Sequence, residues 1–402
     1  MRVWWIAILL LPGCLSDGPE APLDDVAAAS SFTFGAPEVI GVGADVESSL
    51  LVEGDIWLTC SHGGFYQPSP LWASTDAGAT FGRIDPQPNP LVSGDCDLAI
   101  LDSGRWVIVY DTIASATIAW SDDDGATWGF QYAAALPIAV DRPWIAAAGD
   151  VLYMTYSDVM AAEPALQMFA RSDDGGLTWT GHTPVNVAQP PDRIQAVIGK
   201  MVLSDDGQTI HVPLARSNIL LGGPTSLDMA VSRDAGATWS IEEVYGPFEP
   251  NGLVLPVAAW SGDDLVHVLS LPNGTDTDIH VLRGDEAVSV ASGVDLPGVA
   301  GPWMDARDDG ALTLAWVEHV DAGWTVSAAR LHSDGRVEGP IHLAEPTDGD
   351  QGIGHEFIML DHTDDGRAVV TWPMNTGPEC DPAPNPAESR GSQCLWMAVE
   401  TR

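Results

Sequence analysis

The stretch SDDDGATW at residues 121–128 recurs three more times in this chain. The other copies are STDAGATF at 74–81, SDDGGLTW at 172–179 and SRDAGATW at 232–239. All four fit the pattern S-x-D-x-G-x-T-[WF], and their first residues lie 47, 51 and 60 positions apart along the chain. A phrase that returns at a period of about 50 residues is typical of a repeat architecture.

The phrase has the composition of a turn between two strands. An Asp carboxylate accepts hydrogen bonds from the backbone N–H groups that follow it, and a Gly two positions later adopts positive φ without steric cost. The closing Trp or Phe begins the next strand. Because a turn of this kind needs no ligand, we interpret its acidic residues as structural rather than catalytic or metal-binding: Asp76, Asp123, Asp174 and Asp234.

The phrase closely resembles the Asp-box, or BNR repeat, of sialidase-like β-propellers. In that family the box is a turn between the third and fourth strands of a blade, on the face opposite the active site. The resemblance therefore implies an all-β ring of four-stranded blades. The rest of the chain agrees, because short alternating runs are separated by Gly, Pro, Asp and Asn without a helical period.

We predict a seven-bladed propeller. The three C-terminal units lack the box, and the phrases RPW at 142–144 and GPW at 301–303 support the alignment of units three and six. Six blades, the number in the sialidases themselves, is the alternative. The predicted inner strands begin near Asp45, Asp95, Asp141, Arg193, Gly252, Gly301 and Gly354.

The two ends of the chain predict how the ring closes. The seventh unit stops after its third strand at 395–399, while FTFGAP at 32–37 resembles the strand that follows the box at 80–83. We therefore expect an N-terminal strand to complete the last blade. Such a strand pairs an edge that would otherwise be exposed.

The N-terminus predicts export and lipid anchoring. Residues 1–13 read as a signal peptide, because the apolar run after Arg2 is too short to span a bilayer. LPGC at 11–14 resembles a bacterial lipobox, which implies lipid attachment to Cys14; an ordinary export signal is the alternative. Residues 14–30 then form a tether and 31–402 the propeller. Leu15, in place of Asp, favours the outer membrane of the cell envelope, either periplasmic or surface-exposed.

The remaining four cysteines fit an oxidising compartment and allow three pairings. Cys380 and Cys394 are nearest in sequence, which leaves Cys60 with Cys96. In the propeller alignment Cys60 ends one strand and Cys96 begins the next blade on the same face, and this supports the second pairing.

The charge balance excludes several classes of partner. The chain has 57 acidic and 16 basic residues, a formal net charge of −41, and Lys200 is its only lysine. Such a charge argues against nucleic acid and anionic headgroups, so we expect membrane contact through the lipid anchor only. We also expect a monomer, no cofactor and no metal.

The propeller alignment brings the starts of the inner strands and the ends of the second strands to one face beside the axis. The polar residues there are our candidates for ligand binding: Asp95, Asp97, Asp141, Arg142, Asp192, Arg193, His355 and Glu356. Asp95 and Asp97 lie two residues apart, which places both on one side of a strand. They could also act as the paired carboxylates of a glycosidase.

The resemblance to sialidases raises the possibility of catalysis. Those enzymes hold a substrate carboxylate with three arginines and use a Tyr nucleophile assisted by a Glu. This chain lacks the family's Arg-Ile-Pro segment, and its arginines lie on consecutive elements of blades three and four rather than around the ring. The residues that could fill the catalytic roles are Arg142, Arg193, Arg216, Tyr156 and Glu356.

We therefore expect a lipid-anchored envelope propeller that binds a glycan or an envelope protein through this face without catalysis. An exo-α-sialidase-type glycoside hydrolase and a structural or assembly scaffold are the alternatives. A converging arginine trio that faces a Tyr–Glu pair would favour the enzyme, and an acidic, arginine-poor funnel would favour binding. A filled axis with exposed apolar patches would favour the scaffold.

Overall fold

The structure is a computed structural model. The chain divides into two compact units, Met1–Ser31 and Phe32–Arg402, and the fold described below is that of the second unit. No helix of the described residues is long and apolar enough to cross a membrane. The structure describes residues 31–44, 47–62, 69–86, 93–112, 115–132, 140–158, 166–186, 195–219, 222–252, 254–297, 301–347, 358–374, 380 and 393–402.

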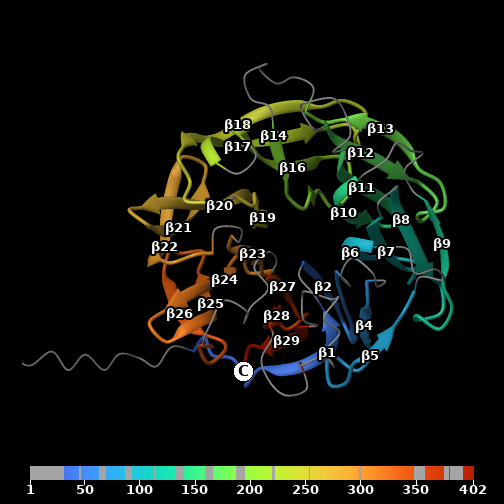
Figure 1. The fold of residues 1–402 in the computed structure, drawn as a ribbon. Helices are drawn as coiled ribbons and strands as arrows, with labels where there is room; N and C mark the ends of the chain where they lie inside the picture. The colour runs from blue at the N-terminus through green and yellow to red at the C-terminus, as the bar shows by residue number, and fades with distance from the viewer. Residues whose placement is uncertain are drawn as a thin grey trace, which may run out of the picture. The chain divides into compact units, whose positions relative to one another are not determined.

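Seven antiparallel sheets of this unit are arranged in a ring, each built from a path of four strands (Figure 1). This confirms the all-β, seven-bladed prediction, and the six-bladed alternative does not hold. Each sheet runs outward from an inner strand beside the axis. The short strand β15 adds to the inner edge of blade 4, where it pairs with β16.

The first four blades follow one another along the chain, each in the order inner to outer strand. Blade 1 contains β2 (Ser48–Glu53), β3 (Ile56–Ser61), β4 (Leu71–Ser74) and β5 (Gly82–Ile84). Blade 2 contains β6 (Ser93–Ile100), β7 (Trp106–Thr112), β8 (Ser115–Ser121) and β9 (Gly129–Tyr132). Blade 3 contains β10 (Val140–Ala148), β11 (Val151–Asp158), β12 (Leu166–Ser172) and β13 (Thr180–Pro184). Blade 4 contains β14 (Gln195–Ile198), β15 (Val202–Leu203), β16 (Ile210–Ile219), β17 (Gly222–Ser232) and β18 (Ser240–Phe248).

The last three blades complete the ring, and the seventh takes its outer strand from the N-terminus. Blade 5 contains β19 (Ala258–Ser261), β20 (Asp264–Asn273), β21 (Asp276–Arg283) and β22 (Glu286–Val294). Blade 6 contains β23 (Trp303–Ala306), β24 (Leu312–Val320), β25 (Gly323–Leu331) and β26 (Val337–His342). Blade 7 contains β27 (Met359–His362), β28 (Ala368–Met374), β29 (Gln393–Val399) and β1 (Glu38–Ala44).

The two faces of the ring follow from the alternating strand directions. The four repeated phrases connect the third and fourth strands of blades 1 to 4, and we call the face that carries them the turn face. The opposite face, where the inner strands begin and the second strands end, is called the entry face.

Each repeated phrase closes on itself through its Asp and Ser side chains. In the copy at 121–128, Asp123 Oδ1 accepts from the backbone N–H of Thr127 at 2.8 Å, and Oδ2 accepts from the Thr127 hydroxyl at 2.7 Å. The Ser121 hydroxyl donates to Asp123 and accepts from the N–H of Gly125. Asp124 and Gly125 both have positive φ, 53° and 82°. The other three copies repeat these four hydrogen bonds.

The glycine of the fourth copy also packs against the neighbouring blade, and this makes its replacement costly. Gly236 has φ of +90°, and an added Cβ would lie 2.0 Å from the Phe169 ring. That ring cannot move aside easily, because Trp239 and Tyr153 pack against it. We expect Gly236→Ala to destabilise the protein by about 3–4 kcal/mol in denaturant unfolding, from backbone strain plus overpacking.

Gly262→Ala is the matched control, because Gly262 has φ of +63° but no atom within 4 Å of the added Cβ. It should show the strain alone, about 1–2 kcal/mol. Equal losses in the two variants would contradict the packing role of Gly236.

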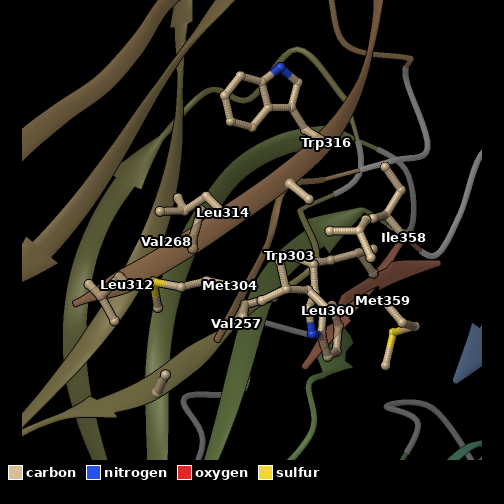
Figure 2. Packing of buried hydrophobic residues seen from close by; sticks show 14 of the residues in the cluster. Val257, Val268, Trp303, Met304, Leu312, Leu314, Trp316, Ile358, Met359 and Leu360 are labelled. Carbon is tan, nitrogen blue, oxygen red and sulfur yellow. The ribbon is translucent and has the colours of Figure 1, made fainter. Parts of the chain in front are cut away.

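The core is formed where the blades pack on one another around the axis. Figure 2 shows side chains of blades 5, 6 and 7 meeting there, among them Val257, Trp303 and Leu360. Trp144 of blade 3 reaches Trp303 of blade 6, with ring centroids 5.9 Å apart. The two phrases aligned from the sequence thus place a tryptophan pair at the entry end of the axis.

The N-terminal segment closes the ring as expected. β1 pairs with β29 from Glu38 opposite Met397 to Ala44 opposite Gln393. The regular strand β1 follows the predicted residues 32–37, and these also pair with the end of the chain, through a bridge between Phe34 and Glu400 and a hydrogen bond from the Gly35 N–H to the Val399 carbonyl. Phe32 is fully buried there, with the guanidinium carbon of Arg330 4.6 Å from the centre of its ring.

Two disulfides are formed as the cysteine spacing favoured. Cys60 of β3 is bonded to Cys96 of β6, which links blades 1 and 2. Cys380 is bonded to Cys394 of β29.

Candidate functional site

Several predicted site residues cannot be placed. Asp192, Arg193, His355 and Glu356 lie outside the described residues, as does the predicted lipid attachment site Cys14. The remaining candidates divide into one group at the entry face and others held within the blades.

Three carboxylates converge at the entry face of blades 2 and 3. Asp95 begins β6, Asp111 ends β7 and Asp141 begins β10, and one oxygen of each lies within 4.8 Å of the others. Arg142 follows Asp141, and its guanidinium is 3.9 Å from the Glu47 carboxylate, just before β2. We call these five residues the entry-face cluster. Asp95, Asp141 and Arg142 were predicted as ligand-binding residues.

Irregular backbone shapes this cluster. The pairing of β6 with β7 shifts register between Ser93 and Cys96, and that of β10 with β11 shifts between Asp141 and Trp144. Such bulges redirect side chains and are common beside functional sites. Glu47 and Arg142 both occupy the left-handed region, with φ of 57° and 51°. This conformation costs a non-glycine residue free energy, and such residues cluster at active sites and ligand clamps as well as in turns.

The cluster contains four carboxyl groups and only one basic group, Arg142. Burial, followed by the charges of Asp95 and Asp141, raises the pKa of Asp111 well above its usual value; a Gly94 N–H and Arg142 act in the opposite direction. Asp95 Oδ2 and Asp111 Oδ1 are buried without a hydrogen-bond partner among the described residues. Gly94 leaves the space for Asp111, since a Cβ there would lie 2.3 Å from its Oδ1.

Asp97 is not part of this cluster. It is fully buried, and its Oδ1 accepts from Ser49 Oγ at 2.6 Å and from Lys200 Nζ at 2.8 Å. Its Oδ2 accepts from the backbone N–H of Ile145 at 2.9 Å. These donors belong to blades 1, 4 and 3, so Asp97 connects four consecutive blades. The ligand-binding role predicted for it does not fit this arrangement.

A second polar site lies on the axis, in a cavity of about 360 Å³ lined by inner-strand residues of blades 1, 4, 5, 6 and 7. Lys200, Asp305 and Asp361 are its charged groups. Burial, and then the charge of Asp305, raises the pKa of Asp361 to about 7. The Asp361 carboxyl is therefore about half protonated at pH 7, and in its protonated form it can donate a hydrogen bond.

His362 contacts both carboxyl groups of this pair. Its Nδ1 lies 2.8 Å from Asp305 Oδ2 and its Nε2 lies 2.9 Å from the Thr313 hydroxyl. Lys200, Asp361 and His362 are not among the site residues predicted from the sequence. Only Lys200 carried a signal, as the single lysine of the chain, because the other residues are distinguished by contacts between blades.

The residues considered for sialidase chemistry are held in separate places. Arg216 and Asp228 form an ion pair inside blade 4, and both residues are buried. The Tyr156 hydroxyl lies 3.1 Å from Nδ1 of His182 on the outer strand β13. Burial, and then Asp158, raises the pKa of Tyr156 to about 12. Of the residues considered for sialidase chemistry, Arg142 is the only described one that belongs to the entry-face cluster.

No protein-family model matches the chain, and no curated protein matches it. Its fold is similar to that of several solved structures. The polysaccharide lyase Uly1 is 10% identical with a TM-score of 0.54, over 94% of this chain and 94% of the lyase. A Trypanosoma rangeli sialidase with 2,3-difluorosialic acid is 12% identical with a TM-score of 0.52, over 87% of this chain. The match spans only 59% of that sialidase.

A third structure, a Dyadobacter fermentans protein of unknown function, is 14% identical with a TM-score of 0.52. The match covers 92% of this chain and all of that protein. These similarities show that the chain shares the fold of these proteins, and they concern the fold alone.

Proposed function

We propose that this protein is a lipid-anchored propeller of the bacterial cell envelope that binds a glycan through its entry face without catalysis. The observation that carries the proposal is the entry-face cluster. Charged side chains from three blades converge there, at two register shifts and at two non-glycine residues with positive φ.

The chemistry of the cluster favours a particular class of glycan. Carboxylates accept hydrogen bonds from sugar hydroxyl groups, and Arg142 can donate to ring or hydroxyl oxygens. When all are ionised, four carboxylates and one guanidinium carry a formal charge of −3. A neutral or amino sugar is therefore the expected ligand, since an anionic sugar would be repelled.

The absence of catalysis is inferred from the residues that sialidase chemistry would need. A Tyr nucleophile requires an accessible hydroxyl of lowered pKa, whereas Tyr156 is buried and its pKa is raised. Arg216 is paired with Asp228. Two proteins of similar fold, a sialidase and a polysaccharide lyase, support a glycan as the ligand.

The test is a binding screen of the full chain in detergent against neutral, amino and anionic oligosaccharides. We expect binding to a neutral or amino sugar and at least a tenfold loss of affinity in Arg142→Ala. Arg105→Ala is the matched control, because Arg105 pairs with Asp122 of the repeated phrase at 121–128, on the turn face. Failure of every glycan to bind, or equal binding by both variants, would reject the proposal. Turnover of an α-sialoside that is lost in Arg142→Ala would reject the absence of catalysis.

The anchor is tested separately. Cys14→Ala should move the protein from the membrane fraction to the soluble fraction, because anchoring needs the acyl chains. An unchanged distribution would contradict lipid attachment at this residue.

A further inference from the structure

We infer that Asp95, Asp111 and Asp141 form a binding site for a divalent cation, with Ca²⁺ as the preferred ion. This inference differs from the expectation, drawn from the sequence, that the protein binds no metal. It does not depend on the proposed glycan binding, because the geometry and the buried oxygens carry it by themselves.

The spacing of the ligand atoms suits a single ion. One oxygen from each carboxylate lies within 4.8 Å of the other two. Ca²⁺ binds oxygen at about 2.3–2.6 Å in flexible geometry, so oxygens on opposite sides of the ion can be about 4.6–5.2 Å apart. Mg²⁺ requires near-octahedral geometry at about 2.0–2.1 Å and is usually held by one or two carboxylates with several waters retained, so a site of three carboxylates favours Ca²⁺.

Buried oxygens without partners are the independent observation. Asp95 is only 8% exposed, and its Oδ2 has no hydrogen-bond partner among the described residues. Asp111 Oδ1 is also buried and has no hydrogen-bond partner among the described residues. Burial of a carboxylate oxygen without a partner is costly, and a cation between the three side chains would satisfy both oxygens at once.

The supporting backbone holds the three carboxylates in place. Cys96, next to Asp95, is tied to Cys60 by a disulfide, and both bulges lie at the ligand positions. Arg142 Nε is 4.0 Å from Asp141 Oδ2, so the proposed ion would share the cluster with one guanidinium group. An ion at this point would also present open coordination positions toward the entry face, where a sugar hydroxyl could bind.

The experiment is calorimetric titration of the full chain, stripped with a chelator, with CaCl₂ and separately with MgCl₂, in the absence of sugar. We expect one Ca²⁺ site with a dissociation constant between about 1 µM and 1 mM and weaker binding of Mg²⁺. Asp95→Asn should reduce Ca²⁺ affinity at least tenfold, and Asp111→Asn should do the same. Asp150→Asn is the control, because Asp150 is an exposed carboxylate in the hairpin between β10 and β11, on the turn face.

Circular dichroism of each variant shows whether it has folded. Asp95→Asn and Asp111→Asn are not expected to unfold the protein, because Asn keeps the size of Asp and one oxygen of each carboxylate has no hydrogen-bond partner among the described residues. The Asp150→Asn control distinguishes Ca²⁺ binding at this site from weak, non-specific ion binding, which a chain with a net charge of −41 also shows. Absence of Ca²⁺ binding, or equal affinities in Asp95→Asn and Asp150→Asn, would overturn the inference. Loss of Ca²⁺ binding with glycan binding unchanged would uphold the ion site and separate it from the sugar site.

Discussion

Glu400→Ala is expected to destabilise the propeller by about 3–5 kcal/mol, because it leaves a buried arginine without its counter-charge. Arg330 of blade 6 donates to both Glu400 oxygens, at 2.5 and 2.6 Å, and both residues are less than a tenth exposed. Glu400 also accepts the N–H of Ala368 in blade 7. The pair therefore joins the last two blades where Phe32 of the N-terminal segment packs on Arg330. Denaturant unfolding measures the loss.

Two further variants separate the buried charge from a general effect of removing a Glu. Glu242→Ala removes an exposed partner of Arg233 and should change stability little. The double variant Arg330→Met/Glu400→Leu should be more stable than Glu400→Ala, because it replaces the whole buried pair with apolar side chains. A double variant no more stable than Glu400→Ala would show that the charge of Arg330 is not the cause.

Asp97→Ala should cost a similar amount, about 3–5 kcal/mol, for a related reason. The change removes the acceptor for the Ser49 hydroxyl, the Ile145 N–H and the Lys200 ammonium at one point. Each of these donors then needs a new partner, and two of them, those of Ser49 and Ile145, belong to fully buried residues. Unfolding of the purified protein, followed by tryptophan fluorescence, gives the change in stability.

Asp97→Asn should lose less, because it keeps the shape and one acceptor oxygen while giving up the charge. Asp150→Ala is the matched control, since Asp150 accepts the Ser103 N–H at 3.0 Å in an exposed hairpin. If Asp97→Ala were no more harmful than Asp150→Ala, the role of Asp97 in joining the blades would be refuted.

The entry-face cluster could be predicted in part. Asp95, Asp141 and Arg142 were selected because the start of an inner strand is a position that the repeat alignment locates. Asp111 lies at the end of a second strand, a position that the repeat alignment brings to the same face, but nothing in the sequence distinguishes it from other strand-end carboxylates. Its importance comes from its distance to Asp95 and Asp141, and that distance depends on how blades 2 and 3 pack.

Asp95 and Asp97 show most clearly where pattern reasoning stops. Two residues apart on a strand, they were expected on one side with one role. The register shift between Ser93 and Cys96 breaks the alternation. Asp97 is consequently buried among donors from three other blades, while Asp95 lies in the cluster with an unpartnered oxygen. A bulge depends on the neighbouring strand, so alternation within one strand does not predict it.

The repeated phrase, the blade count, the closing N-terminal strand and the disulfides could all be read from the chain. The phrase and the blade count depend on short-range chemistry that recurs, namely a carboxylate that bonds to residues four positions ahead and a glycine with positive φ. The closing strand and the Cys60–Cys96 pairing follow from the repeat alignment, which leaves the last blade one strand short and places the two cysteines on one face. The partners of the buried charges were decided only by the closed ring. Asp97 and Lys200 are 103 residues apart, and Arg330 and Glu400 are 70 apart. No local pattern links such residues, because their contact exists only once separate blades have packed around a common axis.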